Sequence, residues 1–204
     1  MDAERYLDLG AGFGAHVLPL LAAGKRVTAV DFNAELLAQL VGAAGGASRL
    51  TTEQADLVRF LEAASGSEWD VILCLGDTLT HLEDEGAVKR LLAQAVLRLS
   101  GRGRLALSYR DSSTFQAEGV ARFIQVARDE TRIMHCLLEP IAQNRLRVTD
   151  IVTEVAADGP RTRLGEYTKL RLPSRTLVDW AEAAGLTLAR QSVEQGMTSL
   201  IFGR

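Results

Sequence analysis

The feature that most constrains this chain is a glycine-rich stretch, YLDLGAGFGA, at residues 6–15. A short apolar run leads into it, and glycine stands at every second position, at Gly10, Gly12 and Gly14. Because glycine has no side chain, such a turn lets a nucleotide lie against the backbone. The same residues also match G-x-G-x-x-A, a dinucleotide pattern, so the stretch by itself leaves NAD and other adenosine cofactors open.

The rest of the first half alternates predicted strands with predicted helices. Strands are predicted at residues 5–10, 26–31, 49–56, 69–76 and 103–111. Helices are predicted between them, at 15–23, after an N-cap at Asn33, after Asp56 and over 84–99. Strands that alternate with helices form parallel sheets through right-handed crossovers. We therefore predict an α/β fold, a Rossmann-like doubly wound sheet with five parallel strands.

The second half has the pattern of an antiparallel sheet. A helix is predicted at 119–127, and three strand-like runs follow at 132–140, 145–155 and 162–172. In the last run, Tyr167 and Lys169 are predicted to share a polar face, on which Tyr167 either contacts the substrate or, as we favour, packs. A helix from Ser174 and a C-terminal antiparallel hairpin, 186–194 with 198–204, complete a predicted sheet of seven strands. We interpret 1–204 as a single domain, in which 112–172 is an insertion of a helix and three antiparallel strands that covers the substrate site.

Composition and charge disfavour several classes of function. The net charge of −3 and the pI near 5.7 argue against a nucleic-acid binder. No apolar run approaches the roughly 20 residues that span a bilayer, and the N-terminus lacks a charged-then-apolar leader. Cys74 and Cys136 lack metal-ligand spacing, so we expect reduced thiols and no metal site. These features predict a cytoplasmic protein with a small-molecule substrate, no nucleic-acid partner and no membrane.

Acidic residues follow the second and third predicted strands, where ligands of open parallel sheets bind. Asp31 ends the second strand, and its carboxylate can accept hydrogen bonds from both hydroxyls of a ribose. Asp56 ends the third strand and can either accept from an adenine amino group or cap the next helix. The fourth strand leads into Asp77 and then into His81, which is either a substrate contact or an ordinary loop histidine.

The order of these motifs resembles that of the class I S-adenosylmethionine-dependent methyltransferases. That family begins with an acid followed by G-x-G-x-G, matched by Asp8 and the three glycines. Its acids after the second and third strands are matched by Asp31 and Asp56. The run CLGDTLTHL, at 74–82, is similar to the corresponding segment of small-molecule N-methyltransferases related to glycine N-methyltransferase. The closing helix and hairpin are also similar to that family's, whose strand seven lies antiparallel between strands five and six.

The resemblance implies a site for S-adenosyl-L-methionine. The glycines and Asp8 would position the amino-acid part of the cofactor, Asp31 would hold the ribose, and Phe32 would lie beside the adenine. The implied cofactor-binding residues are Asp8, Gly10, Ala11, Gly12, Gly14, Asp31, Phe32, Ala55, Asp56, Leu57, Cys74, Leu75 and Gly76. Methyl transfer from a sulfonium is an in-line displacement, so a base is needed only when the acceptor arrives protonated. The catalytic candidates are His81, Tyr109 and Arg110, and we expect the last two to face the ligand crevice at a strand end.

Two other functions stay open from the sequence. The G-x-G-x-x-A overlap supports an NAD(P)-dependent oxidoreductase, and a non-catalytic cofactor-binding module is the third hypothesis. Members of the resembled family usually have some tens of residues before their first strand that fold over the cofactor. That cover is either absent here, missing from this sequence, or supplied by residues 112–172 or by another subunit, and a homodimer through the insertion stays open. The absence of an Asn-Pro-Pro-aromatic segment disfavours a nucleic-acid substrate, and the acceptor atom is not predicted.

Overall fold

A computed structural model describes residues 3–66, 68–113, 115 and 120–204. The chain forms two compact units. The Rossmann-like unit comprises the chain up to Arg110 together with Ser174–Arg204, and the inserted unit comprises Asp111–Pro173. Each unit has its own sheet and its own cluster of buried side chains.

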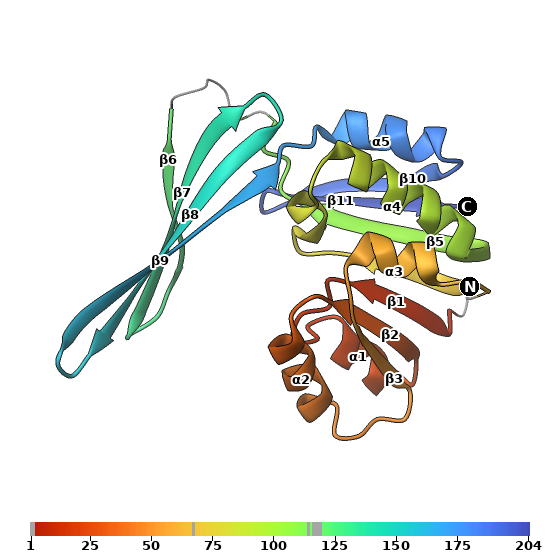
Figure 1. The fold of residues 1–204 in the computed structure, drawn as a ribbon, viewed down its shortest axis with the longest axis horizontal. Coiled ribbons are helices and arrows are strands. Elements are labelled where there is room, and N and C mark those ends of the chain that lie inside the picture. Colours follow the sequence, from red (N-terminus) through yellow and green to blue (C-terminus); the bar gives the residue numbers. More distant parts are fainter. Residues whose placement is uncertain (1–2, 67, 114, 116–119) are drawn as a thin grey trace. The chain divides into compact units, whose positions relative to one another are not determined.

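The sheet of the Rossmann-like unit has seven strands, as the sequence predicted. They are β1 (Arg5–Leu9), β2 (Arg26–Asp31), β3 (Leu50–Gln54), β4 (Trp69–Cys74), β5 (Leu99–Tyr109), β10 (Thr187–Glu194) and β11 (Met197–Gly203). Their order is β10-β11-β5-β4-β1-β2-β3 (Figure 1). Strands β1 to β5 pair in parallel, whereas β11 pairs antiparallel with both β5 and β10. The five parallel strands are confirmed. The C-terminal hairpin is confirmed as well, with β11 lying antiparallel between β5 and β10.

Helices α2 and α4 begin at residues whose side chains cap the first turn. The helices are α1 (Val17–Ala22), α2 (Ala34–Ala43), α3 (Leu57–Ala63), α4 (Glu85–Arg98) and α5 (Ser174–Ala183), with a short 3₁₀ helix, η1 (Thr78–His81). The Asn33 side chain accepts hydrogen bonds from the main-chain N–H of Glu35 and Leu36, which starts α2. The Asp84 side chain accepts from the N–H of Ala87, at 2.7 Å, and starts α4. Caps of this kind each stabilise a helix by about 1 kcal/mol.

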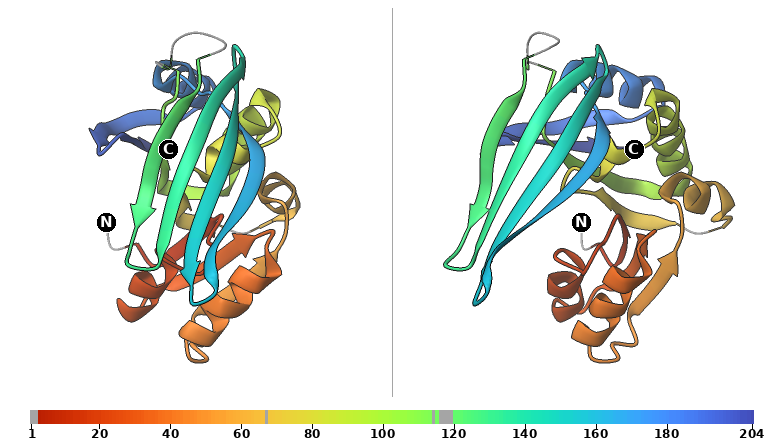
Figure 2. Two further views of the ribbon diagram at one scale, coloured as in Figure 1. Left: turned by 90° about the vertical axis from the view of Figure 1, so that its left-hand side faces the viewer. Right: turned by 60° about the vertical axis from the view of Figure 1, so that its left-hand side comes forward.

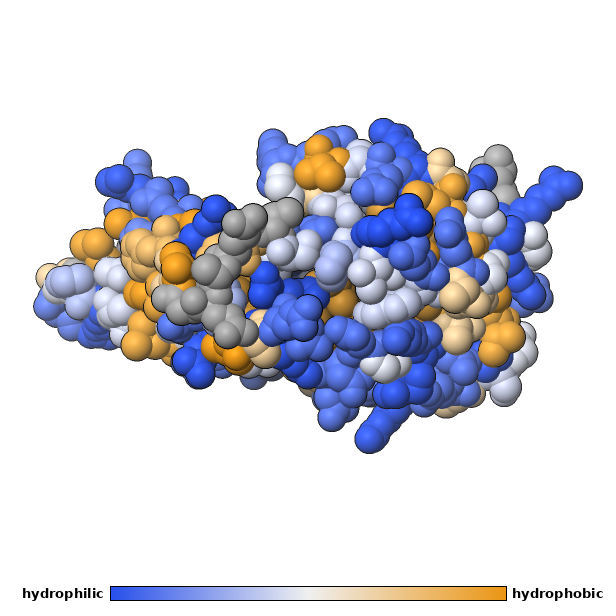
Figure 3. Space-filling model, turned by 90° about the horizontal axis from the view of Figure 1, so that it is seen from above, coloured by the Kyte–Doolittle hydropathy of each residue, from blue (hydrophilic) through white to orange (hydrophobic). Residues whose placement is uncertain are grey.

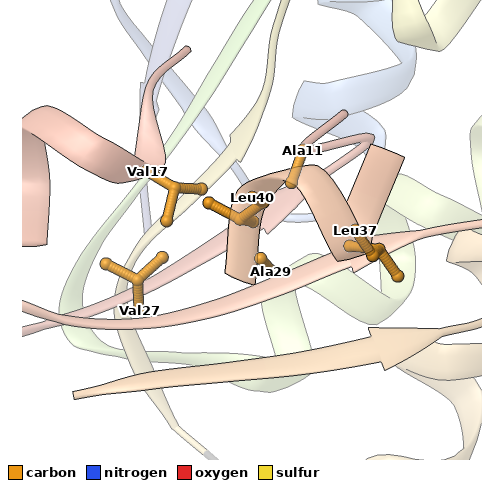
Figure 4. Close-up of a cluster of buried hydrophobic side chains, with 6 residues drawn as sticks. All are labelled: Ala11, Val17, Val27, Ala29, Leu37 and Leu40. Carbon is orange, nitrogen blue, oxygen red and sulfur yellow. The ribbon is translucent and has the colours of Figure 1, made fainter. Parts of the chain in front are cut away.

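One face of the sheet is covered by α1 and α2. Val27 and Ala29 of β2 pack there against Val17 of α1 and against Leu37 and Leu40 of α2 (Figure 4). Each valine or leucine buried in this way contributes roughly 1.5–3 kcal/mol relative to an exposed side chain. Because side chains alternate along a strand, the neighbouring positions of β2 face the other side, where α3 contacts β2 (Figure 1). Helices on both faces leave the carboxyl ends of the strands as the place for a ligand.

The inserted unit is a four-stranded antiparallel sheet rather than the predicted helix and three strands. Its strands are β6 (Arg122–Arg128), β7 (Arg132–Ala142), β8 (Arg145–Ala156) and β9 (Gly159–Leu170), side by side in that order (Figure 2). The helix predicted at 119–127 is wrong: β6 occupies most of that segment, while Gly119 lies outside the described residues. Phe123, Ile124 and Val126 are residues that favour strands. The free edge of β7 supplies the hydrogen-bond partners that a strand needs.

A small apolar cluster forms the core of the inserted unit. Phe115, Cys136, Leu146 and Val148 are buried in it, and Tyr167 packs against it. Tyr167 therefore packs, which the sequence favoured over a substrate contact, although its face of β9 was predicted to be polar. The sequence pattern marked alternate faces of β9 correctly, but the loop that carries Phe115 decided which of the two faces is covered.

Arg171 joins two main-chain segments of the inserted unit. Its guanidinium donates to the carbonyl oxygens of Phe115 at 2.6 Å, Gln143 at 3.2 Å and Ser112 at 3.4 Å. Main-chain carbonyls in a loop need partners when they are partly buried. A guanidinium can satisfy several carbonyl groups at once because it carries five N–H donors. Arg171 therefore holds the loop with Phe115 beside the β7–β8 turn.

No described helix is long and apolar enough to cross a membrane. The described part of the chain also contains no group of three or more His, Cys, Asp or Glu side chains arranged to hold a metal ion.

Candidate active site

A cavity of about 620 Å³ opens in the Rossmann-like unit where the parallel strands end. Pockets for small ligands typically range from about 300 to 1,000 Å³. Its lining residues are Gly10, Asp31, Phe32, Ala55, Asp56, Leu57, Val58, Arg59, Glu62, Thr78, His81, Leu82, Glu83, Ala87 and Arg90. The structure thus brings residues that follow β1, β2 and β3 together with η1, as the parallel topology predicts.

Asp31 holds the glycine-rich loop in place. Its Oδ2 accepts a hydrogen bond from the N–H of Gly12 at 2.8 Å, and its Oδ1 accepts from the N–H of Asn33 at 2.9 Å. The side chain is buried at the wall of the cavity. Each carboxylate oxygen has two acceptor sites, so each retains one for a ligand. Asp31 can therefore fix the loop and receive two hydroxyl groups at the same time.

Gly10 lies so close to Thr78 that no side chain fits between them. A Cβ on Gly10 would stand 2.4 Å from Cγ2 and 2.5 Å from Oγ1 of Thr78. Thr78 Oγ1 itself donates to the main-chain oxygen of Leu75 at 2.8 Å, which fixes the hydroxyl. Thr78 lines the cavity, although the sequence reasoning did not place it in the site. Its position directly after the CLGD run was the signal that could have identified it.

Asp8 is a buried carboxyl behind the glycine-rich loop. The residue is 1% exposed, and its Oδ2 has no hydrogen-bond partner among the described residues. The nearest cationic candidate is His16, whose Nδ1 lies 4.0 Å from Oδ2. Burial, and secondly the charge of Asp31, raise the pKa of Asp8 to about 7. A carboxyl with these surroundings is an orphaned polar group next to a ligand cavity.

The wall toward β3 and α3 combines an exposed aromatic ring with a helix start. Phe32 is 77% exposed at the cavity, which leaves its ring accessible to a flat ligand. Asp56 Oδ1 accepts from the N–H of Arg59 at 2.9 Å and thereby caps α3. The capping role that the sequence offered as the alternative for Asp56 is confirmed, and Asp56 lines the cavity as well. Leu57 is buried beside it and Ala55 is half-buried.

The far wall was missed by the sequence reasoning. Its residues are Val58, Arg59, Glu62, Leu82, Glu83, Ala87 and Arg90. They lie on α3, on α4 and in the segment just before α4. These residues reach the cavity because α3 packs against α4. Sequence reasoning that considers only the residues at strand ends cannot identify these lining residues, because their position depends on the contact between two helices.

Several predicted residues lie outside the cavity wall. Asp8, Ala11, Gly12, Gly14, Cys74, Leu75 and Gly76 do not line it. Cys74 is fully buried, and burial followed by the charge of Asp8 raises the pKa of its thiol far above the usual range. A thiol in that state is a packing group and no nucleophile. The N–H of Gly76, in a left-handed turn, donates to Ser108 Oγ at 2.9 Å, which ties the end of β4 to β5.

Asp77 and Arg110 form a charged pair where β4 and β5 end. Asp77 Oδ2 accepts from a guanidinium nitrogen of Arg110 at 2.7 Å, and Asp77 Oδ1 accepts from the main-chain N–H of Arg110 at 2.6 Å. Asp77 has φ of +76°, a conformation that costs an aspartate about 1–2 kcal/mol. The Arg110 side chain is exposed, as predicted, but Tyr109 is fully buried. The expected exposure of Tyr109 is wrong because its side chain points to the core-facing side of β5.

Comparison with known proteins agrees with this geometry. Residues 7–103 match a family described as a methyltransferase domain. This part of the chain is therefore similar to the methyltransferase domain of that family. A glycine/sarcosine N-methyltransferase of Halorhodospira halochloris is 37% identical over 112 residues, which are 53% of this chain and 41% of that protein. The chain spans about two fifths of the length of the glycine/sarcosine N-methyltransferases it matches.

Solved methyltransferases share the fold of this domain. The CcbJ methyltransferase of Streptomyces caelestis has a TM-score of 0.85 at 19% identity, covering 98% of this chain and 83% of that one. CalS10, an amino pentose methyltransferase of Micromonospora echinaspora solved with S-adenosylmethionine, has a TM-score of 0.80 at 21% identity, covering 100% and 84%. The Rossmann-like unit also differs from a dinucleotide-binding fold in its sheet. Such folds have strand order 3-2-1-4-5-6, whereas here the antiparallel β11 stands between β5 and β10.

Proposed function

We propose that this protein transfers the methyl group of S-adenosylmethionine to the nitrogen of a small amine. The observation that carries the proposal is the cavity at the ends of β1, β2 and β3, in which the glycine-rich loop is fixed by Asp31. The family match and the N-methyltransferase relatives support the reaction class. The position of β11 in the sheet counts against the NAD(P) alternative.

The residues present fit the cofactor. Asp31 keeps an acceptor site on each carboxylate oxygen for the ribose hydroxyls, and the exposed ring of Phe32 offers a surface for the adenine. Gly10 lines the cavity with its backbone, and a side chain at this position would collide with Thr78. The orphaned Oδ2 of Asp8 suits a cationic ligand behind the same loop. In this proposal Asp56 and Leu57 bound the adenine edge.

Bound S-adenosylmethionine supplies a methyl group that is activated by a sulfonium charge. The residues of the chain then have to align the acceptor and exclude water, which accounts for much of the acceleration in such a displacement. An amine that arrives protonated must also lose a proton. His81, in η1 at the cavity, is our candidate acceptor for that proton because imidazole titrates near neutral pH. The fully buried Tyr109 stays a weaker candidate.

We propose that the acceptor carries a carboxylate, as glycine does. Arg110 is the exposed cation at the end of β5, and Asp77 holds its guanidinium from one side. A guanidinium has further N–H donors for a second carboxylate. The relatives named glycine/sarcosine N-methyltransferases make glycine the first acceptor to test.

Titration calorimetry with S-adenosylhomocysteine and, separately, with NAD tests the cofactor assignment directly. We expect S-adenosylhomocysteine to bind and NAD to fail, and the reverse result would refute the proposal. Asp31→Ala should weaken S-adenosylhomocysteine binding by at least tenfold, about 1.4 kcal/mol, because two hydrogen bonds and the loop anchor are lost. Leu97→Ser, at an exposed position of α4 outside the cavity wall, serves as the control and should leave the affinity unchanged.

The acceptor assignment is tested with two amines. Methylation of glycine is compared with methylation of ethanolamine, which has no carboxylate. Arg110→Gln should raise the KM for glycine by tenfold or more and change the KM for ethanolamine little. Equal effects on the two amines would mean that Arg110 does not bind the carboxylate.

We also propose that two copies associate through one face of the inserted sheet. Phe123, Leu137, His135, Ile151 and Leu164 share this face, because residues paired across antiparallel strands point the same way. Phe123 stacks on His135 with ring centroids 4.7 Å apart, yet Phe123 is 60% and Leu164 71% exposed. Hydrophobic residues, in orange, also lie at the surface of the inserted unit at the left of Figure 3. Contiguous exposed apolar side chains of this kind mark interfaces.

Molecular mass in solution tests the association. We expect light scattering after gel filtration to show a dimer, and Phe123→Ser with Leu164→Ser to give a monomer. Ile124→Ser is the matched control, because Ile124 is the next residue of β6 and points to the opposite face. A monomeric wild-type protein would refute the proposal. Cys74 and Cys136 are buried and form no disulfide, which fits a reducing compartment, so we propose a cytoplasmic location. A cover of the substrate site by 112–172 stays a prediction.

A further inference from the structure

Three titratable groups surround one buried oxygen behind the glycine-rich loop. Oδ2 of Asp8, on β1, has no hydrogen-bond partner among the described residues. The charge of Asp31, on β2, raises the pKa of Asp8 because two negatively charged carboxylates repel each other. His16, just before α1, places Nδ1 4.0 Å from the same oxygen. Cys74, on β4, is the third neighbour, and the charge of Asp8 acts on its thiol.

The two carboxylates of this cluster have opposite surroundings. Asp31 accepts two main-chain N–H bonds, one on each carboxylate oxygen. Burial and the like charge of Asp31 disfavour the ionised form of Asp8. No hydrogen-bond donor among the described residues contacts Oδ2 to offset them. Asp31 lines the cavity, so a ligand there changes the charge that Asp8 experiences. A cation near Asp31, and hydroxyl groups that donate to it, both reduce the repulsion between the carboxylates.

We propose that binding of S-adenosylmethionine releases the proton of Asp8, so that the buried carboxylate balances the positive charge of the ligand. This inference rests on the proposed function, because it needs that ligand in the cavity. The O–H bond of Asp8 breaks, its electron pair stays on the carboxylate, and the proton passes to the solvent. It leaves on the side of His16, whose half-exposed ring is the titratable group between Oδ2 and water. S-adenosylhomocysteine lacks the sulfonium charge and should release less.

The size of the effect follows from the ionisation of Asp8. With a pKa of about 7 in the ligand-free protein, roughly one tenth of Asp8 is ionised at pH 6 and nine tenths at pH 8. If only the ionised form is present in the complex, affinity for S-adenosylmethionine is about tenfold weaker at pH 6 than at pH 8. Close to one proton should be released per ligand at pH 6, and close to none at pH 8.

Titration calorimetry in two buffers with different ionisation enthalpies counts these protons. The wild-type protein is compared with Asp8→Asn, a neutral variant of nearly the same shape, so that titration of the ligand itself cancels. We expect Asp8→Asn to bind S-adenosylmethionine at least tenfold more weakly at pH 8 and to release no proton at pH 6. Binding by the wild-type protein without proton release at pH 6 would overturn this inference alone. Absence of any binding at either pH would instead overturn the proposed function.

Substitution of His16 provides a second test. A merely structural role for Asp8 predicts that the pH dependence of binding stays the same when His16 is replaced. His16→Lys places a permanent cation beside Oδ2, which favours the carboxylate, so the pH at which affinity falls should move down. His16→Gln carries no charge at this position, so that pH should stay above the value for His16→Lys. His16 makes no side-chain cap bond to α1, and both variants should therefore fold. A midpoint that is the same in both variants would exclude the assigned role of His16.

Discussion

Replacing Gly10 by alanine tests the geometry on which the site depends. Gly10 and Gly12 both have a left-handed backbone, with φ of +79° and +54°. They differ in the space around them. A Cβ on Gly10 would stand 2.4 Å from Thr78 Cγ2, whereas a Cβ on Gly12 meets no heavy atom within 4 Å. The pair therefore separates the cost of backbone strain from the cost of a collision.

The two costs can be estimated separately. A left-handed backbone costs a residue with a Cβ about 1–2 kcal/mol, and this applies to both variants. Forcing extra atoms into a packed site typically costs a further 1–3 kcal/mol, and this applies to Gly10 alone. We expect Gly10→Ala to lower the free energy of unfolding by about 2–5 kcal/mol and Gly12→Ala by about 1–2 kcal/mol.

Urea unfolding followed by circular dichroism measures the difference, from midpoints taken at unchanged slope. Thr78→Ala removes the two nearest atoms and leaves Thr78 Cβ, which is 3.0 Å from the new methyl carbon. The double variant Gly10→Ala, Thr78→Ala should therefore recover most of the collision cost, after correction for Thr78→Ala alone. Equal losses for Gly10→Ala and Gly12→Ala, or no coupling with Thr78, would refute the reasoning.

Three further predictions concern stability. The carboxyl of Asp8 has a pKa raised from 3.8 to about 7 in the folded protein, so its ionisation destabilises the fold as the pH rises between these values. Ligand-free Asp8→Asn should be more stable than wild type at pH 8, and the gain should shrink toward pH 4, as thermal unfolding across pH will show. Arg171→Lys should cost about 1–3 kcal/mol in urea unfolding because one ammonium cannot reach the same carbonyl groups, whereas exposed Arg175→Lys should change the free energy by less than about 0.5 kcal/mol. Asp77→Ala and Asp77→Gly both lose the pair with Arg110, but alanine keeps the strain of φ +76°, so Asp77→Gly should be the more stable of the two by about 1 kcal/mol.

The fold of the Rossmann-like unit was predictable because local pattern and tertiary environment agree there. Asn33 and Asp84 cap helices through bonds to N–H groups two or three residues away, which local sequence determines. The segment 122–128 was not predictable in the same way. Its apolar residues suit a helix or a strand, and the free edge of β7 decided between the two.

The sequence by itself determined which residues stand at the ends of the strands. Asp31, Phe32 and Asp56 could be placed at one site because parallel strands end at the same edge of a sheet. Only the tertiary structure decided the rest of the cavity. Val58 and Ala87 reach it through the packing of α3 against α4, and Tyr109 is buried rather than exposed. Strand direction is a local property that a motif reveals, whereas the contact between two helices depends on side chains that are far apart in the sequence.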